Sequence, residues 1–525
     1  MRLYLGLDCS TQSLTAMAIA IDGGRREVVW ERSLEFDRDL PGYRTRHGVL
    51  PSADPLIAVS PPLMWAEALD AVLADLATSG LDLTRLTAIA GSAQQHGSVY
   101  LNQSSTACLA TLDPARPLAD QLRRIFTRET APIWMDASTS AECAEIAAAV
   151  GGAARLAGIT GSRAFERFTG PQIRRVAKQH PDAYAATTRI DLVSSFMASL
   201  LAGRHAPLDP GDASGMNLMD LHTRCWSREA LDATAPDLEP KLPPIAPATT
   251  VIGALSPYWQ TRHRLPPAAL VVWTGDNPSS LAGTGIVEEG QVAVSLGTSD
   301  TIFGLMHTPH VDPGGAGHVF GAPTGDYMGL TCLRNGSLAR ERIRDAHGLD
   351  WRGFSRALET TSPGQDGALM LPWFEPEITP TVNAPAVHRR NLDAGAPHAN
   401  VRALVEAQMM ALANHSRWMG IDVRTIHATG GASANRAILR VMADVFGADV
   451  FQFQVGNAAC LGAALRAWHA DAAARGSTRP WSAIVAGLAE PIAASRIQPD
   501  GDAVRIYAAL RAEYARFEAD VLSRR

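Results

Sequence analysis

The sequence predicts an α/β protein made of two structurally related halves. The chain has 525 residues, which is too long for one ordinary hydrophobic core and favours two domains. Short apolar runs of strand length alternate with longer segments that have helical periodicity. A strand, a polar turn and a second strand occur twice, at residues 3–21 and 292–305. This repetition indicates an internal duplication of one structural device.

The composition is typical of a globular enzyme, with 46% hydrophobic and 19% charged residues. The net charge of -6 and the pI near 6.2 argue against a general nucleic-acid binder. No apolar run reaches membrane length, and residues 3–7 are too short for a signal peptide. The six cysteines have no CxxC spacing, which favours reduced thiols in a cytoplasmic protein.

The chain contains only two lysines, Lys178 and Lys241, and no GK[ST] sequence. A Walker-A phosphate loop is therefore excluded. Any phosphate group must be held by main-chain N–H groups, by Ser and Thr hydroxyls, by arginine or through a metal ion.

The first half begins with a predicted hairpin. Residues 3–7 and 14–21 are apolar strands, and the polar segment Asp8–Ser13 connects them. An Asp-Gly-Gly turn at residues 22–24 then leads into a third strand at residues 28–31.

The second half repeats this hairpin directly after an acidic residue. Asp276 stands on a Gly-Asp-Asn turn ahead of a helix-like SSLAG run. Strands at residues 292–296 and 301–305 then enclose a Gly-Thr-Ser-Asp turn. Such a turn presents backbone N–H groups and hydroxyls to an anion. One acid beside one anion loop indicates phosphoryl transfer to a hydroxyl, with the acid as base. The alternative is two ordinary hairpins of an α/β protein.

Two further segments have the pattern of ligand-binding edges. A buried strand at residues 86–90 leads into a polar Gly91–Gly97 cluster that contains His96, and a strand follows at residues 98–101. A hydrogen-bonded structural role for His96 stays open. The second segment is a strand at residues 425–429 that ends in Gly430-Gly431, where a nucleotide could approach the backbone closely.

Periodicity also predicts several helices. Residues 62–77 have one apolar face, and a second helix is expected from a cap at Ser138 or Thr139 to about Val150. Residues 190–201 are predicted as an amphipathic or buried helix, and the helix that follows Gly431 is expected to end at Gly447. Three histidines in the loop region 307–326 match no standard zinc spacing.

These segments together resemble the FGGY family of carbohydrate kinases. The motifs GLDCSTQS, SAQQHGSVY, PIWMDASTSAEC, GSRAFERFTG, TGDNPSSLAG, SLGTSDT and ATGGASANR occur in that family's order. Within the family, SAQQHG, GSRAFERFTGPQI, LVSSF and DASGMNL are most similar to the xylulose kinases. The resemblance covers nearly the whole chain up to about Ala470.

The resemblance implies an α/β fold of two ribonuclease-H-like domains around a central cleft, as in actin, hexokinase and Hsp70 ATPases. Residues 1–285 would carry the sugar site, the first phosphate hairpin and the catalytic acid, and residues 286–525 the second hairpin and the adenosine site. The implied activity is ATP-dependent phosphorylation of the terminal hydroxyl of D-xylulose, with Mg²⁺ as metal. The implied partners are the sugar and ATP, without nucleic acid or membrane, and a homodimer stays an open option.

The motifs also carry roles onto individual residues. Asp276 resembles the catalytic base, and Asp8 resembles the acid near magnesium and the terminal phosphates. Many family members carry Arg shortly after the acid of the WxD motif, but here Asp136 precedes Ala-Ser-Thr, so no sugar contact is assigned there. The matching positions are His96, Arg167, Asp276 and Asn277 for the sugar, Thr11, Ser13, Gly297 and Thr298 for the phosphates, and Trp351, Gly430, Gly431, Ala432 and Asn435 for adenosine.

Other functions stay open at this point. One is a related FGGY kinase for another ketopentose, a polyol or glycerol. Others are an actin-like ATPase switch without sugar transfer, and a non-catalytic sugar-binding regulator. The polar clusters at Gln94-Gln95-His96 and Asp276-Asn277 favour a small polar substrate, and the presence of both Asp8 and Asp276 disfavours the regulator.

Overall fold

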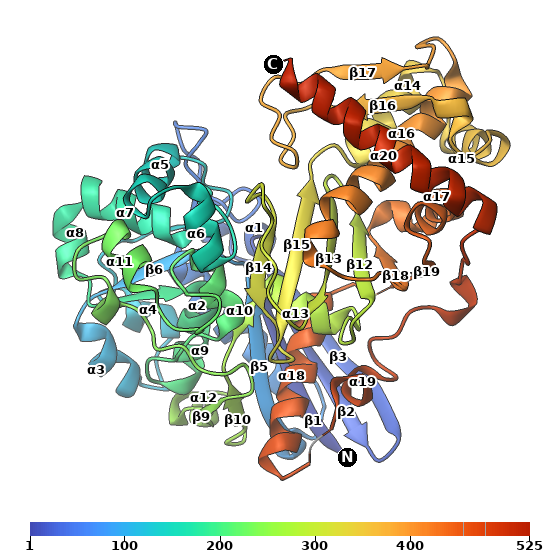
Figure 1. The fold of residues 1–525 in the computed structure, drawn as a ribbon. Helices are drawn as coiled ribbons and strands as arrows, with labels where there is room; N and C mark the ends of the chain where they lie inside the picture. The colour runs from blue at the N-terminus through green and yellow to red at the C-terminus, as the bar shows by residue number, and fades with distance from the viewer. Residues whose placement is uncertain (455, 478, 525) are drawn as a thin grey trace. The chain divides into compact units, whose positions relative to one another are not determined.

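The computed structural model describes residues 1–454, 456–477 and 479–524 (Figure 1). The chain divides into two compact units, and each is described by itself. Unit 1 consists of Met1–Val287, Val319–Tyr327 and Val455–Glu490, and unit 2 consists of Glu288–His318, Met328–Gln454 and Pro491–Arg525. The chain passes from unit 1 to unit 2 two residues after the expected boundary at 285, but two later segments return to unit 1.

Unit 1 contains a mixed sheet in which the first predicted hairpin is present. Strand β1 runs antiparallel to β2 and parallel to β5. The turn between β2 and β3 contains Gly23 at φ 59°, as the Asp-Gly-Gly pattern predicts. The strand order is β3-β2-β1-β5-β10-β9, with β11 also paired to β5. The strands are β1 Arg2–Cys9, β2 Ser13–Asp22, β3 Arg25–Glu35, β5 Leu86–Ala93, β9 Val251–Ala254, β10 Ala269–Val271 and β11 Thr274–Gly275.

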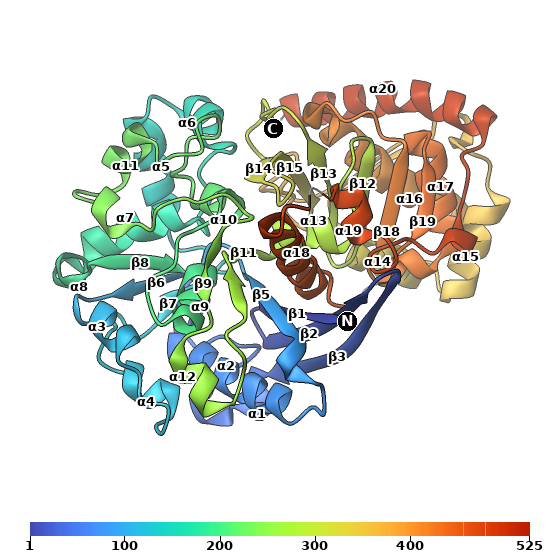
Figure 2. The same ribbon diagram turned by 90° about the horizontal axis from the view of Figure 1, so that it is seen from below.

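Helices cover both faces of this sheet (Figure 2). Helices α13 (Asp276–Gly283) and α18 (Ala458–Ala474) pack together on one face, and α2 (Pro62–Ala77) and α9 (Val193–Ala202) pack on the other. The predicted bounds of α2 are confirmed. Helix α18 lies so close to β1 that a Cβ at Gly6 would be 2.2 Å from the carbonyl oxygen of Cys460. Glycine at position 6 is therefore what permits this close packing.

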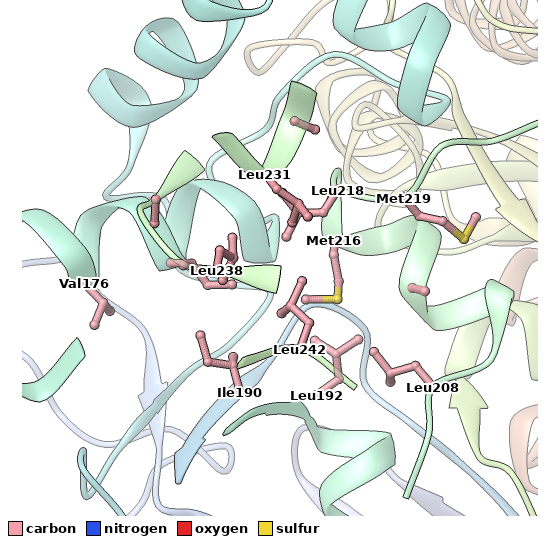
Figure 3. Close-up of a cluster of buried hydrophobic side chains, with 14 of the residues drawn as sticks. Val176, Ile190, Leu192, Leu208, Met216, Leu218, Met219, Leu231, Leu238 and Leu242 are labelled. Carbon is pink, nitrogen blue, oxygen red and sulfur yellow. The ribbon is translucent and has the colours of Figure 1, made fainter. Parts of the chain in front are cut away.

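A second layer of unit 1 has a hydrophobic core of its own (Figure 3). Met216, Leu218 and Leu242 meet there with side chains from strand β8 (Arg189–Leu192) and helix α7 (Thr169–Gln179). The prediction of one helix over residues 190–201 is wrong at its start, because β8 pairs with β6 (Ser98–Leu101) before α9 begins. The local sequence is mostly apolar there and has no clear period, and only the pairing partner decides the conformation.

Helix α5 (Ser140–Ala149) begins where the sequence predicts, but without the expected cap. Thr139 occupies the N-cap position and its hydroxyl donates to the carbonyl oxygen of Glu166 (2.6 Å) instead of accepting from the helix. Helices α5 and α6 (Ala153–Thr160) are jointly apolar enough for a membrane span but are bent by 85°, and no single helix of the described residues passes that test.

Unit 2 repeats the hairpin arrangement. Strand β12 runs antiparallel to β13 and parallel to β18, as β1 does to β2 and β5. Helix α16 (Pro397–His415) packs on this sheet and against its neighbouring helices. The strands are β12 Gln291–Leu296, β13 Asp300–Met306, β15 Tyr327–Leu333, β18 Thr425–Thr429 and β19 Asp449–Gln452, and the other main helices are α14 Ser337–Ala346, α15 Trp351–Thr360, α17 Arg436–Phe446 and α20 Gly501–Ser523.

The remaining elements are short. The strands are β4 Val59–Ser60, β7 Ala131–Pro132, β14 His318–Gly321, β16 Leu369–Pro372 and β17 Val387–Arg390. The helices are α1 Phe36–Asp39, α3 Ser104–Ala110, α4 Leu118–Leu122, α8 Pro181–Ala186, α10 Pro210–Ala213, α11 Arg228–Thr234, α12 Pro257–Arg262 and α19 Trp481–Val485.

Candidate active site

Polar residues gather in unit 1 at the carboxyl ends of β1, β5 and β11. Asp8 on β1 and Thr274 on β11 are both in register with Ser92 of β5, one from each side. Asp276 follows Thr274 by two residues and is the first residue of α13. The pairing thus brings two acids that are far apart in sequence to one edge of the sheet, the edge at which open α/β sheets bind ligands.

Asp8 is a buried carboxyl group held by hydroxyls. Ser92 donates to Oδ1 (2.6 Å) and Ser10 donates to Oδ2 (2.5 Å). Burial raises the pKa of Asp8, while the two hydrogen bonds oppose that shift. A desolvated carboxylate that is held only by hydroxyls fits a cation.

Asp276 has the properties expected of a general base near neutral pH. Its Oδ1 accepts from the backbone N–H of Asn277 (2.8 Å) and from Nδ2 of the same residue (3.1 Å). Burial, followed by the negative charge of Asp8, raises the pKa of Asp276 to about 7. Such a carboxyl group can both take up and release a proton at physiological pH.

His96 is a buried neutral imidazole in an unusual backbone conformation, with φ 74°. Its Nδ1 donates to the carbonyl oxygen of Gly215 (2.7 Å), which leaves Nε2 as an acceptor. Burial, followed by the charge of Arg167, lowers the pKa of His96 to about 3. The Arg167 guanidinium lies over the rings of Phe165 (4.9 Å) and Phe168 (5.6 Å). The structural hydrogen bond of His96 therefore exists alongside a ring nitrogen that can still bind a ligand.

The first hairpin places Thr11 in the β1–β2 turn of unit 1. The Thr11 hydroxyl accepts from the indole N–H of Trp134 (2.7 Å) and donates to Oε1 of Gln94 (3.4 Å). Ser13 begins β2, in register with Glu35 of β3. Both candidate residues lie at the tip that the sequence predicts.

The second hairpin, in unit 2, is held by a buried ion pair. Gly297 and Thr298 lie in the turn between β12 and β13. Arg340 of α14 makes two hydrogen bonds with the Asp300 carboxylate (2.8 and 2.9 Å) and a longer one to the carbonyl oxygen of Gly297 (3.4 Å). The N–H of Ser337 also donates to that carbonyl (2.8 Å). The position of the turn thus depends on α14.

A cavity of about 890 Å³ adjoins this hairpin within unit 2. Gly430, at φ 82°, comes directly before the lining residue Gly431 in sequence. A Cβ at position 430 would be 2.5 Å from the carbonyl oxygen of Leu296. Asn435 caps α17 by accepting from the N–H groups of Ala437 and Ile438, and its Nδ2 donates to Ser355 (2.9 Å). The predicted residues that line the cavity are Gly297, Thr298, Trp351, Gly431, Ala432 and Asn435.

Trp351 stands at this cavity with 44% of its surface exposed. The Arg344 guanidinium lies 4.4 Å from the centre of its ring system, and Phe354 packs edge-on at 5.4 Å. An exposed indole beside a cavity offers a stacking surface for a flat ring.

Sequence reasoning missed several residues of both sites. Arg340, Ser355 and Arg436 line the cavity of unit 2, and Asp212 lies buried near Asp276 in unit 1. Helical periodicity offers a weak signal for Arg340, because that position falls on the apolar face of α14. Asp212 begins the DASGMNL motif, but neither the motif nor its turn-rich surroundings assigned it a role.

The site residues fit a magnesium ion that ATP helps to hold. Within the described ranges, no three His, Cys, Asp or Glu side chains could hold a metal ion by themselves. Mg²⁺ in kinases is usually held by one or two carboxylates together with phosphate oxygens and water. The buried carboxylate of Asp8 meets that requirement.

Comparison with known proteins identifies the family. The model described as "FGGY family of carbohydrate kinases, C-terminal domain" matches residues 292–470, and the N-terminal-domain model matches residues 127–283. A xylulose kinase from Rattus norvegicus is 44% identical over 535 aligned residues, which cover 100% of this chain and 98% of the relative. Xylulose kinase 2 of Arabidopsis thaliana is 43% identical over 89% of this chain and 87% of its own.

Solved structures agree on the fold. A xylulose kinase from Rhodospirillum rubrum superposes with a TM-score of 0.82 at 19% identity over 99% of both chains. The Plasmodium falciparum glycerol kinase with ADP has a TM-score of 0.75 at 16% identity over 98% of both. The predicted two-domain α/β fold of the actin and hexokinase type is thereby confirmed. Since both domain models match and the relatives align along the chain, this protein belongs to the FGGY family of carbohydrate kinases and is an ATP-dependent carbohydrate kinase.

Proposed function

We propose that this kinase transfers the γ-phosphate of ATP to the terminal hydroxyl of D-xylulose, giving D-xylulose 5-phosphate and ADP. The observation that carries the reaction type is Asp276, a partly buried carboxyl group with a pKa of about 7. The choice of sugar is supported by relatives named as xylulose kinases that are 43–44% identical over most or all of the chain.

Asp276 acts as the general base. A sugar hydroxyl stays protonated at neutral pH, so its proton must leave as the oxygen attacks the γ-phosphorus. The Asp276 carboxylate takes that proton, the new O–P bond forms, and the bond to the ADP oxygen breaks. A base of this kind contributes about 10²–10⁴-fold to the rate. The two N–H groups of Asn277 hold the carboxylate in one orientation.

His96, Arg167 and Asn277 orient the sugar. Nε2 of His96 accepts a hydrogen bond from a sugar hydroxyl, because its Nδ1 already donates to the carbonyl oxygen of Gly215. Arg167 supplies N–H donors for carbonyl or hydroxyl oxygens of the ketose. A polyhydroxylated substrate is thus met by both an acceptor and a donor.

Each unit carries groups suited to the nucleotide. The cavity beside Gly431 and Asn435 accepts adenosine, with Trp351 as its stacking surface. In unit 2, the turn at Gly297 and Thr298 offers N–H groups and a hydroxyl suited to phosphate, and in unit 1 the turn at Thr11 and Ser13 offers groups of the same kind. Asp8 would hold Mg²⁺, which when bound neutralises charge on the terminal phosphates.

Product analysis tests the proposal. Purified enzyme is incubated with Mg-ATP and, in parallel, with D-xylulose, D-ribulose, L-ribulose, a pentitol and glycerol, and ADP and sugar phosphate are measured. We expect D-xylulose to give the highest kcat/KM and a 5-phosphate product. Phosphorylation of another sugar with clearly higher kcat/KM would replace D-xylulose as substrate, and ADP release without a sugar product would favour an ATPase.

The pH dependence of the reaction should show the titration of Asp276. A general base works in its deprotonated form, so kcat/KM for the sugar should fall about tenfold per pH unit below the pKa. We expect a plateau at alkaline pH and half of the maximal value at a pH of about 7. His96 stays neutral over this range because its pKa is lowered to about 3.

The control for this profile is the residual activity of Asp276→Asn. ATP itself titrates near neutral pH, and a fall in kcat/KM at acid pH that is caused by the nucleotide would persist in the variant. An acid limb that is identical in the two enzymes would show that Asp276 does not control the profile.

A further inference from the structure

A chain of buried polar groups lies behind Asp276, and the proposed mechanism leaves most of it without a role. The hydroxyl of Ser194 on α9 donates to Oδ2 of Asp212 on α10. The Gln95 side-chain amide faces the same carboxyl group. Oε1 of Gln95 in turn accepts from Nδ2 of Asn277 (2.8 Å). All four residues belong to unit 1, and this series of hydrogen-bonded side chains ends at the Asp276 carboxylate.

The orientation of the Gln95 amide is fixed by its neighbours. Its Nε2 donates to the carbonyl oxygen of Gly211 (3.3 Å), a group that can only accept. A Cβ at Gly275 would be 2.4 Å from Cγ of Gln95, and one at Gly215 would be 3.2 Å from its Nε2. Gln95 therefore lies in a tight slot, with its nitrogen toward Gly211 and Asp212 and its oxygen toward Asn277.

The hydrogen bond to Gln95 sets the orientation of the Asn277 side-chain amide. Its Nδ2 donates both to Oε1 of Gln95 and to Oδ1 of Asp276 (3.1 Å). Since the nitrogen is occupied on that side, Oδ1 of Asn277 points away from both partners. If the Gln95 amide turned over, two N–H groups would face each other, and Asn277 would have to turn as well.

Asp212 is the group that can fix the orientation of the Gln95 amide. It is completely buried, and its Oδ1 has no hydrogen-bond partner within standard distance among the described residues. Burial, and then the charges of Asp209 and Asp276, raise the pKa of Asp212 well above its ordinary value. Because Ser194 donates to Oδ2, Oδ1 is left as the acceptor that faces the Gln95 nitrogen.

We propose that Asp212, held by Ser194, is a positioning residue that fixes the amide orientations of Gln95 and Asn277, and so determines which pattern of sugar hydroxyls the site accepts. Through Gln95, Asp212 makes Asn277 present an oxygen acceptor rather than an N–H donor. The inference rests on the proposed sugar-kinase function, and specifically on the sugar site around Asp276.

Four substitutions test this role. Asp212→Asn reproduces the shape and polarity of the neutral acid, whereas Asp212→Leu removes the acceptor. Ser194→Ala removes the group that holds Asp212. The control is Ser199→Ala, another buried serine of α9 whose hydroxyl bonds only within its own segment, to the carbonyl of Ser195 and the N–H of Ala206. For each variant, kcat and KM are measured for D-xylulose, for its C3 epimer D-ribulose and for ATP, together with Tm.

For Asp212→Leu we expect kcat/KM for the preferred sugar to fall about 10- to 100-fold, as for a buried polar group that loses its partner. The ratio between the two epimers should shrink, and KM for ATP should stay unchanged. Asp212→Asn should retain both kcat/KM and the epimer ratio, and Ser194→Ala should lie between the two. Ser199→Ala should change Tm without changing the epimer ratio.

Two results would overturn the inference. One is an Asp212→Leu enzyme with the wild-type epimer ratio, which would reduce Asp212 to a structural role. The other is an equal loss of kcat/KM and of the epimer ratio in Asp212→Asn and Asp212→Leu, which would mean that the wild-type enzyme needs a charged carboxylate at position 212. If the Leu variant does not fold, Gln95→Glu replaces it, because a carboxylate at position 95 cannot donate to Gly211, and an unchanged epimer ratio would again contradict the inference.

The wild-type enzyme separates this inference from the proposed function. A wild type that prefers another sugar rejects D-xylulose as substrate, but the variants are still compared on that sugar and on its epimer. A wild type that phosphorylates D-xylulose, together with variants that keep its epimer ratio, rejects the positioning role alone.

Discussion

Asp276→Asn is expected to lower kcat about 10²–10⁴-fold while sugar binding persists. An asparagine has nearly the same shape and can still accept the two hydrogen bonds from Asn277. It cannot take up the proton of the attacking hydroxyl, so the loss should lie in kcat rather than in KM. Steady-state kinetics with Mg-ATP and D-xylulose, and calorimetric titration with the sugar alone, measure the two effects separately.

The matched control is Asp444→Asn in unit 2. Asp444 is a buried aspartate whose pKa, like that of Asp276, is raised by burial, and it accepts from the backbone N–H of Asp500 (2.8 Å). It lies outside both candidate sites, so its substitution should leave kcat near the wild-type value. Near-normal turnover of Asp276→Asn would remove Asp276 as the base.

Arg340→Met is expected to destabilise unit 2 by about 3–5 kcal/mol, the typical cost of breaking a buried ion pair from one side. Arg340 is 1% exposed, and the substitution leaves the Asp300 carboxylate buried without its two hydrogen bonds. The turn that carries Gly297 and Thr298 also loses the hydrogen bond from Arg340 to the Gly297 carbonyl and keeps the one from the Ser337 N–H. A higher KM for ATP should therefore accompany the loss of stability.

Urea unfolding compares this variant with Arg390→Met, which carries the same substitution in an exposed pair. Arg390 and Glu513 are 34% and 45% exposed, and a pair of this kind contributes about 0–1 kcal/mol. The double variant Arg340→Met with Asp300→Leu removes both charges and should recover part of the lost stability. Equal effects of the Arg340 and Arg390 substitutions would show that burial of the pair does not matter.

Local patterns in the sequence were sufficient for much of the secondary structure. The hairpin at Gly23, the helix at residues 62–77 and the helix end at Gly447 are all present. Each depends on neighbours in sequence, through apolar periodicity or through a glycine that can adopt positive φ. Where the chain is mostly apolar, as at residues 190–201, local pattern could not separate strand from helix.

The sequence could name candidate site residues but not the contacts that give them their properties. Motif order pointed to Asp8, His96 and Asp276, and the structure places all three within unit 1. The pKa of Asp276 depends on burial and on the charge of Asp8, and the tautomer of His96 depends on the carbonyl of Gly215. These contacts join residues from distant segments, and no local pattern encodes them.

The sequence by itself determined the duplicated hairpins, the family and the candidate residues, because periodicity, turn chemistry and motif order are properties of neighbouring positions. Only the tertiary structure decided that α18 packs in unit 1, that Arg340 holds the second hairpin and that Asp212 lies behind Gln95. Close packing and desolvation decide these features, and both depend on which distant segments the fold brings together.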